Sequence, residues 1–363
     1  MQTPIPFVMM RGGSSRGPYF NRDDLPEDLD TLAQVLIHVV GAGHPLNIDG
    51  IGGSAAVTTK VAMLSRSDDE WADIDYFFGQ VAVEKREVDF KPTCGNILSG
   101  VASAAVELGL FKPTGDVSEV KIRAVNTGAR IAADILTPNG VPEYAGDVAI
   151  DGVPGTAAPV RLRFMDVMGG ATGEMLPTGN RIDDIDGVEV TCLDVAMPMV
   201  IARAADFGIT GYETRDELDA NTELFQRIEA VRLKAGERMG MGDVTQSVTP
   251  KFGLLAPARE GGHVTARYFM PWKTHPTMAV TGAQCLSACI LMPGSIAEGI
   301  ANRPSGSPTD VIIEHPSGQI EVLTEYQSDE QGGFAIQSAG LTRTTRKLVQ
   351  GEVFIPGSVW AGR

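Results

Sequence analysis

One cysteine of this chain stands where a predicted helix begins. Cys94 precedes Gly95 and Asn96, and small and apolar residues with helical spacing continue from 97 to 110. The backbone N–H groups at a helix start have no acceptor within the helix, so such positions favour thiolates and bind carboxylates. The sequence therefore offers a thiol beside a place suited to an anion. By itself, however, a single cysteine at a helix start is more often structural than catalytic.

A lysine in an apolar segment is the second residue that could do chemistry. Lys60 lies in the segment 55–64, within a strand that the sequence predicts from Ala56 to Ser65. Burial favours the neutral form of an amine, which can then accept a proton. Most lysines in strands are solvated edge charges, so this role also needs support from elsewhere in the chain.

The composition indicates a globular protein with room for two full-sized cores. The chain has 363 residues, of which 43% are hydrophobic and 21% are charged. Its formal net charge of -16 argues against nucleic acid or an anionic membrane as a partner. Without a membrane-length apolar run or a signal-like N-terminus, the expected compartment is the cytoplasm.

The remaining cysteines do not suggest a metal site. The four cysteines form no CxxC pair and the five histidines are scattered, so no zinc site is expected. The other three thiols are expected to be small buried hydrophobes: Cys192, Cys285 and Cys289. The glycine pairs at 12–13 and 52–53 lack the strand–GxGxxG–helix pattern, so no dinucleotide site is expected.

The pattern of strands and helices predicts two related α/β domains, residues 1–183 and 184–363. A shift of 188 residues aligns Leu98 with Leu286, a weak internal match that suggests one central helix wrapped by strands in each half. The last strands could pack back on the first domain. The Gly/Met pattern at 237–242 favours a helix C-cap and a loop. The expected helices are 28–40, 97–110, 214–218 and 222–239, and the expected strands include 5–10, 76–83, 120–125, 130–136, 144–150, 160–165, 188–195, 197–201, 252–256, 264–270, 311–314, 320–326, 334–339 and 348–355, with a loop at 166–186.

Six short segments, spread in order over nearly the whole chain, carry a family resemblance: residues 10–17, 49–53, 58–62, 94–96, 281–283 and 343–346. Together they resemble the PrpF-like isomerases, which have the diaminopimelate-epimerase-like fold. Within that family, the chain is most similar to the 4-oxalomesaconate isomerases or tautomerases of gallate and protocatechuate breakdown. The 2-methylaconitate cis-trans isomerases come second.

The resemblance implies a two-domain α/β (α+β) fold with an active site in the cleft between the domains and chemistry without a cofactor or metal. It implies that Lys60 and Cys94 are the catalytic residues. Epimerases of this fold use two cysteines, and here Thr281-Gly282-Ala283 stands at the second position, which disfavours racemisation by a cysteine pair. The family commonly has Thr-Ser-Lys-Gly in its first turn. Arg16 keeps the charge in this chain but changes its geometry.

Moving a double bond in an unsaturated di- or tricarboxylate needs one group to remove a proton and another to return it. We assign removal to Lys60 and return to Cys94, and the order could be reversed. The candidate substrate contacts are the hydroxyls and cation of the first turn and its neighbours, the two helix starts, and two residues before the second helix: Ser14, Ser15, Arg16, Ser54, Thr59, Gly95, Asn96, Lys273, His275, Thr281, Gly282 and Ala283.

Alternatives stay open at this point. A non-catalytic carboxylate-binding protein could keep the fold without the chemistry. An amino-acid epimerase would need a second cysteine at the site, and Cys285 lies about one helical turn too far along its helix. The residues do not decide between keto–enol tautomerisation, a 1,3-allylic shift and a cis–trans change. Exposed strand edges are compatible with a homodimer.

Overall fold

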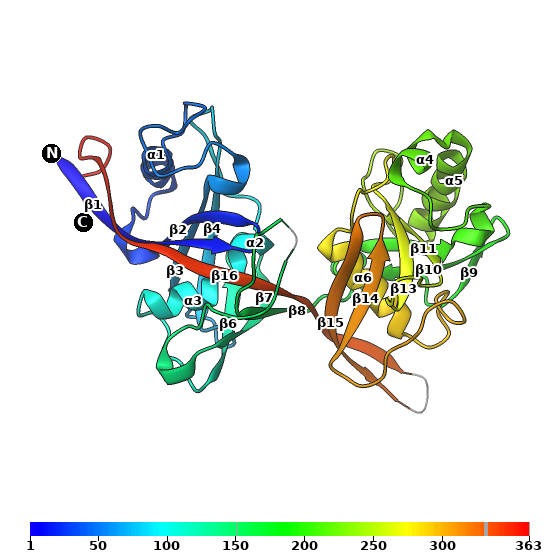
Figure 1. The fold of residues 1–363 in the computed structure, drawn as a ribbon. Coiled ribbons are helices and arrows are strands. Elements are labelled where there is room, and N and C mark those ends of the chain that lie inside the picture. Colours follow the sequence, from blue (N-terminus) through cyan, green and yellow to red (C-terminus); the bar gives the residue numbers. More distant parts are fainter. Residues whose placement is uncertain (151, 330–332, 363) are drawn as a thin grey trace. The chain divides into compact units, whose positions relative to one another are not determined.

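The structure, a computed structural model, describes residues 1–150, 152–329 and 333–362. The chain forms two compact units (Figure 1): unit 1 is Met1–Phe164 with Thr342–Arg363, and unit 2 is Met165–Leu341. Within the described ranges, no helix combines the length and apolar character that a membrane span requires.

Unit 1 is built on a mixed sheet with the strand order β1-β2-β3-β4-β6-β7-β8. The last strand, β16 (Phe334–Pro356), pairs antiparallel with β1 from Gln2↔Pro356 to Gly12↔Thr345, so both chain ends belong to this unit (Figure 1). The other strands of the unit are β1 Gln2–Gly12, β2 Ser15–Asn21, β3 Lys60–Arg66, β4 Ile74–Val81, β5 Val88–Asp89, β6 Val117–Ala124, β7 Ala129–Leu136 and β8 Pro159–Met165.

The two faces of this sheet are covered by different helices. Side chains of a strand alternate between faces. Phe20, Val61 and Met63 share a buried cluster with α1 (Leu29–Val40), which begins after its N-cap Asp28. Tyr19, Ala62 and Leu64 instead share a cluster with α2 (Gly95–Leu98) and α3 (Val101–Glu107). The face that carries Tyr19 is therefore the one that receives Cys94, the N-cap of α2.

Unit 2 has a sheet of the same kind. Its strand order runs from the start of β16 through β15-β14-β13-β12-β11-β10 to β9. Helix α5 buries Ile228, Val231 and Ala235 against strand residues, and ten of the twelve residues of α6 are buried. The elements are β9 Asp183–Ile185, β10 Val188–Asp194, β11 Pro198–Arg203, α4 Arg215–Ala220, α5 Thr222–Arg238, β12 Lys251–Ala256, β13 Val264–Phe269, α6 Val280–Leu291, β14 Thr309–His315 and β15 Gly318–Ser328.

The two units repeat one topology. In unit 1, the successive pairs β1–β2, β2–β3, β3–β4, β4–β6 and β6–β7 are antiparallel, parallel, antiparallel, parallel and antiparallel. In unit 2, the pairs β10–β11, β11–β12, β12–β13, β13–β14 and β14–β15 follow the same order. A helical segment enters at each parallel crossover, as this connection requires. The predicted fold class is confirmed, and α2–α3 corresponds to α6.

Several predicted elements differ in detail. The helix predicted over 97–110 is divided at Ser99 and Gly100 into α2 and α3. Gly100 lets the Tyr19 hydroxyl come close, since a Cβ at position 100 would lie 2.4 Å from it. The strand predicted from Ala56 begins only at Lys60, since residues Ala56–Thr58 form a short 3-10 helix. Residues 144–150 form a single bridge, Val148↔Ala157, rather than a strand. The last two predicted strands are one, β16, and the predicted loop 166–186 contains β9.

The Gly/Met pattern after α5 is a helix end, as predicted. Helix α5 ends at Arg238, and Gly240 has φ 74°, a left-handed conformation that favours glycine. The N–H of Met241 bonds back to the carbonyl of Gly236 at 2.9 Å.

Candidate active site

The two residues that could do chemistry touch each other in unit 1. Lys60 Nζ lies 3.0 Å from Cys94 Sγ, although 34 residues separate them. Cys94 is 9% exposed and Lys60 is half-buried. The lysine ammonium position also lies 5.9 Å from the centre of the Phe78 ring. Two groups that can each bind a proton are thus held within proton-transfer distance of each other.

The sheet explains why Lys60 points at Cys94. Lys60 alternates with Ala62 and Leu64, which belong to the buried cluster that contains Cys94. Strand β2 passes so close to the start of β3 that a Cβ at position 17 would lie 1.8 Å from the carbonyl oxygen of Lys60. Gly17 is therefore the residue that lets β2 approach the lysine.

Two buried tyrosines, which the sequence analysis missed, hold the start of α2. The hydroxyl of Tyr19 donates to the carbonyl of Ile97 at 2.5 Å, and that of Tyr76 donates to the carbonyl of Cys94 at 3.4 Å. Both side chains are fully buried, and this burial raises the pKa of each phenol well above its ordinary value. The neighbouring Cys94 raises both pKa values further. They are neutral donors that fix the backbone around the thiol. In the sequence they look like ordinary apolar strand positions.

The turn between β1 and β2 is fastened to the same helix start. Asn96 Nδ2 donates to Ser14 Oγ at 3.1 Å, and the Ser14 N–H points to Asn96 Oδ1 at 3.5 Å. Gly13 has φ 52°, and a Cβ there would lie 2.3 Å from Asn96 Oδ1. Two of the predicted contact residues, Ser14 and Asn96, therefore bond to each other, and the glycine makes that approach possible.

The late segment 343–346 reaches this turn from the other end of the chain. Arg11 donates from Nη1 to Gly13 O at 2.9 Å and to Thr344 O at 3.0 Å, while Thr345 Oγ1 donates to Arg11 O at 2.7 Å. Burial lowers the pKa of Arg11, and the positive charge of Arg346 lowers it further. Arg11 bonds to backbone carbonyls and so helps to frame the turn.

Two polar groups of β2 have no hydrogen-bond partner among the residues that the structure describes. Ser15 is 2% exposed, and its hydroxyl bonds to nothing within the described residues. It alternates with Tyr19 on the face that carries Lys60 and Cys94. The Nε of Arg16 is also buried and unpartnered, and a Cβ at Gly53 would lie 2.6 Å from Arg16 Nη2. A buried polar group without a partner is costly unless a ligand or water completes it.

The other hydroxyl candidates have different surroundings. Thr59 is fully buried, and its hydroxyl already donates to the carbonyl of Val81 at 2.7 Å. Ser54 is exposed in the glycine-rich loop, where Asn47 Oδ1 accepts its N–H at 2.8 Å. Of the predicted hydroxyls, Ser15 is the one that is both buried and free to bond.

The helix start at Cys94 is shorter than predicted. Helix α2 has four residues before the break at Ser99, so its dipole is weaker than that of the helix expected over 97–110. The N–H groups of Gly95 and Asn96 still lack acceptors within the helix. The site is thus distinguished less by the helix dipole than by the Lys60–Cys94 contact and by the Ser15 hydroxyl and Arg16 Nε, which have no partner within the described residues.

The remaining predicted residues lie in unit 2. Gly282 and Ala283 are in the first turn of α6, where a Cβ at Gly282 would lie 2.7 Å from the Tyr268 ring. Thr281 is exposed, and its hydroxyl lies 3.3 Å from Met197 Sδ. His275 is half-buried, its N–H donates to Tyr268 O at 2.8 Å, and burial lowers its pKa. Lys273 is exposed.

No second thiol stands at the start of α6. The N-cap of α6 is Ala279, and Cys285 lies inside the helix, fully buried. Burial raises the pKa of Cys192 and of Cys289 to about 12, and raises that of Cys285 as well. These three thiols are buried, as the sequence predicts.

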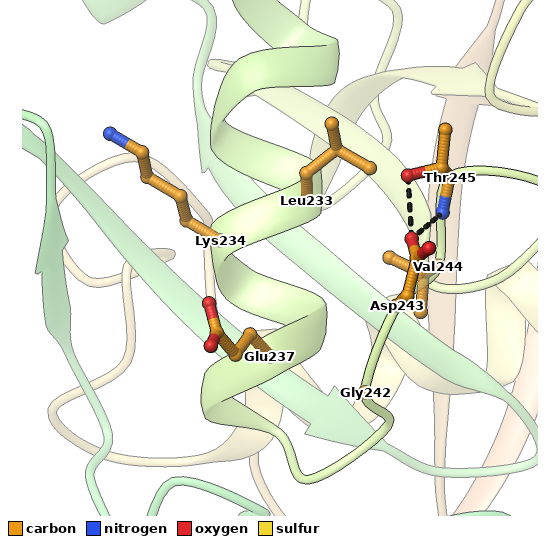
Figure 2. A pocket seen from close by; sticks show the side chains of 7 residues that line it. All are labelled: Leu233, Lys234, Glu237, Gly242, Asp243, Val244 and Thr245. Carbon is orange, nitrogen blue, oxygen red and sulfur yellow. Dashed lines mark hydrogen bonds between the residues drawn. The ribbon is translucent and has the colours of Figure 1, made fainter.

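A second region of the described chain, at the end of α5, is hollow, but Lys234 and Asp243 beside it already have partners. A hollow of about 340 Å³ lies beside the end of α5, where Leu233 points toward the loop at Val244 and the Lys234 ammonium points away (Figure 2). Lys234 is paired with Asp186 at 2.5 Å. Asp243 accepts hydrogen bonds from Thr245, as Figure 2 shows. Within the described ranges, no group of three or more His, Cys, Asp or Glu side chains is placed to hold a metal ion.

Residues 2–356 match the family model described as PrpF protein. A protein of Novosphingobium sp. (strain KA1) named (4E)-oxalomesaconate Delta-isomerase is 46% identical over 350 residues, covering 96% of this chain and 97% of the relative. The 4-oxalomesaconate tautomerase of Pseudomonas putida is 44% identical over 361 residues, with 99% of each chain covered. The crystal structure of methylitaconate-delta-isomerase superposes with a TM-score of 0.89 at 31% identity, covering 99% of this chain and 97% of that one.

Proposed function

Because this chain belongs to the PrpF protein family, we propose that it is a proton-transfer isomerase that moves a double bond in 4-oxalomesaconate. The family and the isomerase class agree with the sequence prediction, which is confirmed on both points. We choose this substrate because two relatives that align with almost the full chain are named for it. The predicted place in gallate or protocatechuate breakdown goes with that substrate and is part of the proposal.

The observation that carries the mechanism is the 3.0 Å contact between Lys60 Nζ and Cys94 Sγ. One of the two groups removes a proton from the acidic carbon of the substrate, and the other delivers a proton to a different carbon. Because the two groups are in contact, the proton taken up by the first group can pass to the second after each turnover, which restores both. We keep Lys60 as the group that removes the proton and Cys94 as the one that returns it.

Charge that develops on the substrate needs fixed donors. The buried Ser15 hydroxyl faces the same side of the sheet as Lys60 and has no other partner within the described residues. The N–H groups of Gly95 and Asn96 and the guanidinium of Arg16 are the further donors that we propose for carboxylates or the dienolate in unit 1. Ser14 and Asn96 bond to each other, so we give them the role of holding the turn.

A second candidate substrate rests on the structural comparison. The similarity to methylitaconate-delta-isomerase, at a TM-score of 0.89, favours an allylic shift in a smaller dicarboxylate as the alternative. The two oxalomesaconate relatives are more similar in sequence, which is why oxalomesaconate comes first. The contact between Lys60 and Cys94 argues against a carboxylate-binding protein without chemistry.

The test is steady-state kinetics of Lys60→Met and Cys94→Ser with 4-oxalomesaconate, with methylitaconate as the comparison. Each variant is expected to lose kcat by about 10³-fold or more while its thermal melting stays close to wild type. Lys121→Met is a matched control. Lys121 lies on β6 of the same unit, and its ammonium is 5.9 Å from the centre of the Trp71 ring, the same distance as between Lys60 and Phe78. Wild-type turnover in both active-site variants would refute the mechanism.

A further inference from the structure

One strand of unit 1, β4, changes its neighbour in the middle of its length. On the side away from β3, it pairs with β6 from Ile74 to Tyr76 and with β5 at Gln80 and Val81. Phe78 lies between these two pairings, so neither strand bonds to its backbone N–H and C=O groups. Backbone groups inside a sheet are costly to leave unpaired, so Phe78 needs a partner from elsewhere.

The side-chain amide of Asn126 is that partner. Asn126 lies in the turn that follows β6 and is half-buried. Its Oδ1 accepts the N–H of Phe78 at 2.9 Å, and its Nδ2 donates to the carbonyl of Phe78 at 2.9 Å. An amide carries both a donor and an acceptor, so this one side chain bonds to Phe78 as a neighbouring strand would.

The same amide also holds the segment 90–94, which ends at the catalytic thiol. Its Nδ2 donates to the carbonyl of Phe90 at 2.6 Å, and the Phe90 ring stacks on that of Phe77 with 5.2 Å between the ring centres. At the other end of the segment, the Tyr76 hydroxyl donates to the carbonyl of Cys94 at 3.4 Å. The segment is therefore attached to β4 at both of its ends.

Phe78 is also the residue that packs against the lysine. It pairs with Ala62 across β3 and β4, and its ring centre lies 5.9 Å from Lys60 Nζ. Phe78 and Cys94 belong to one buried cluster. Asn126 thus bonds to the backbone of the residue beside Lys60 and to the segment that carries Cys94.

We propose that Asn126 is a positioning residue for the Lys60–Cys94 pair, which keeps the amine and the thiol 3.0 Å apart by joining β4 to the segment 90–94. This proposal rests on the proposed function, because the contact matters for turnover only if the two groups move protons. The role is geometric: Asn126 exchanges no proton with the substrate.

The kinetic experiment compares Asn126→Ala and Asn126→Asp with wild type on 4-oxalomesaconate. A misplacement of about 1 Å in a catalytic group can cost about 10²-fold in rate, so Asn126→Ala is expected to lower kcat at least about tenfold and to leave KM within about threefold. Asn126→Asp keeps the shape and the acceptor for the Phe78 N–H, but its carboxylate cannot donate to the two carbonyls, so a similar loss of kcat is expected.

Asn21→Ala is the matched control. Asn21 also bonds to backbone in unit 1, where its Oδ1 accepts the N–H of Asp23 at 3.1 Å. It is the last residue of β2 and pairs with Leu64, whereas Lys60 is the first residue of β3. The control is expected to lose some thermal stability and to keep wild-type kcat. Wild-type kcat in a folded Asn126→Ala or Asn126→Asp protein would overturn the proposal, as would a loss confined to KM.

A crystal structure of Asn126→Ala beside one of wild type separates this proposal from the proposed reaction. The distance from Lys60 Nζ to Cys94 Sγ is expected to be about 1 Å or more longer in the variant than in wild type. If it lengthens in a protein whose wild type converts no 4-oxalomesaconate, the positioning role stands and the reaction is wrong. If wild type converts 4-oxalomesaconate and the distance is the same in both proteins, the reaction stands and the positioning role is wrong.

Discussion

A single methyl group at position 17 tests whether the close approach of β2 to β3 sets the contact between Lys60 and Cys94. In Gly17→Ala, the new Cβ would lie 1.8 Å from the carbonyl oxygen of Lys60 and 2.8 Å from its carbonyl carbon. Real Cβ atoms essentially never come closer than 3.0 Å to such atoms, so the backbone must open by at least 3.0 − 1.8 = 1.2 Å. Because the obstacle is backbone, no side-chain rotation relieves it.

The displacement falls on the residue that carries the amine. A misplacement of about 1 Å in a catalytic group can reduce turnover by about 10²-fold. We therefore expect Gly17→Ala to lower kcat about 100-fold. Overpacking of a closely fitted site should also reduce the free energy of unfolding by about 1–3 kcal/mol.

The assay is kcat for 4-oxalomesaconate together with urea unfolding. Gly351→Ala is the matched control: it adds the same methyl group to a strand of unit 1, β16, where no heavy atom lies within 4 Å of the new Cβ. It is expected to keep wild-type kcat and to be neutral or slightly more stable. A Gly17→Ala protein with wild-type kcat and stability would refute the reasoning.

Three further predictions concern the thiols, an acid in unit 2 and a tyrosine. Iodoacetamide under native conditions should alkylate Cys94 before the three fully buried thiols, as read by peptide mass spectrometry, and equal labelling of all four would contradict this. Burial alone would raise the pKa of Glu314, but bonds from three backbone N–H groups and a threonine hydroxyl lower it to about 2 from 4.5. This carboxylate should therefore stabilise the fold by up to about 3 kcal/mol above pH 4.5, and lose that effect as the pH falls toward 2. In urea unfolding, the free energy of unfolding of Glu314→Gln should therefore lie below that of wild type at neutral pH, and this difference should shrink at low pH. A difference that stays the same at all pH values would contradict the role of the carboxylate. Tyr19→Phe leaves the Ile97 carbonyl without its 2.5 Å donor and should cost about 1–3 kcal/mol in the same assay, whereas wild-type stability would show that the bond contributes nothing.

Much of the fold follows from patterns that the sequence displays directly. The helix at Leu29–Val40 has Asp28 as its N-cap and a regular apolar face, so its place was predictable. The weak internal match between the halves has its physical basis in a common order of parallel and antiparallel strand pairs. What the sequence could not show was the close approach of the Tyr19 hydroxyl to Gly100, because the two residues lie 81 positions apart.

In the candidate site, too, some features could be predicted from the sequence and others could not. Cys94 and Lys60 stand out by residue type and by family resemblance, and the structure brings them to 3.0 Å. Gly17, which lets β2 approach Lys60, looks like any turn glycine in the sequence. Tyr19 and Tyr76 were missed, since an aromatic residue in a strand has no local signal that separates it from ordinary sheet positions.

Proton transfer by Lys60 and Cys94 can be followed directly by an NMR time course in deuterated buffer, with 4-oxalomesaconate and wild-type enzyme, Lys60→Met or Cys94→Ser. Wild type is expected to convert the substrate with deuterium delivered to one carbon, which also identifies tautomerisation or an allylic shift. Both variants are expected to be inert on that time scale. Conversion by either variant at the wild-type rate, or a wild-type product without deuterium at any carbon, would contradict proton transfer by Lys60 and Cys94.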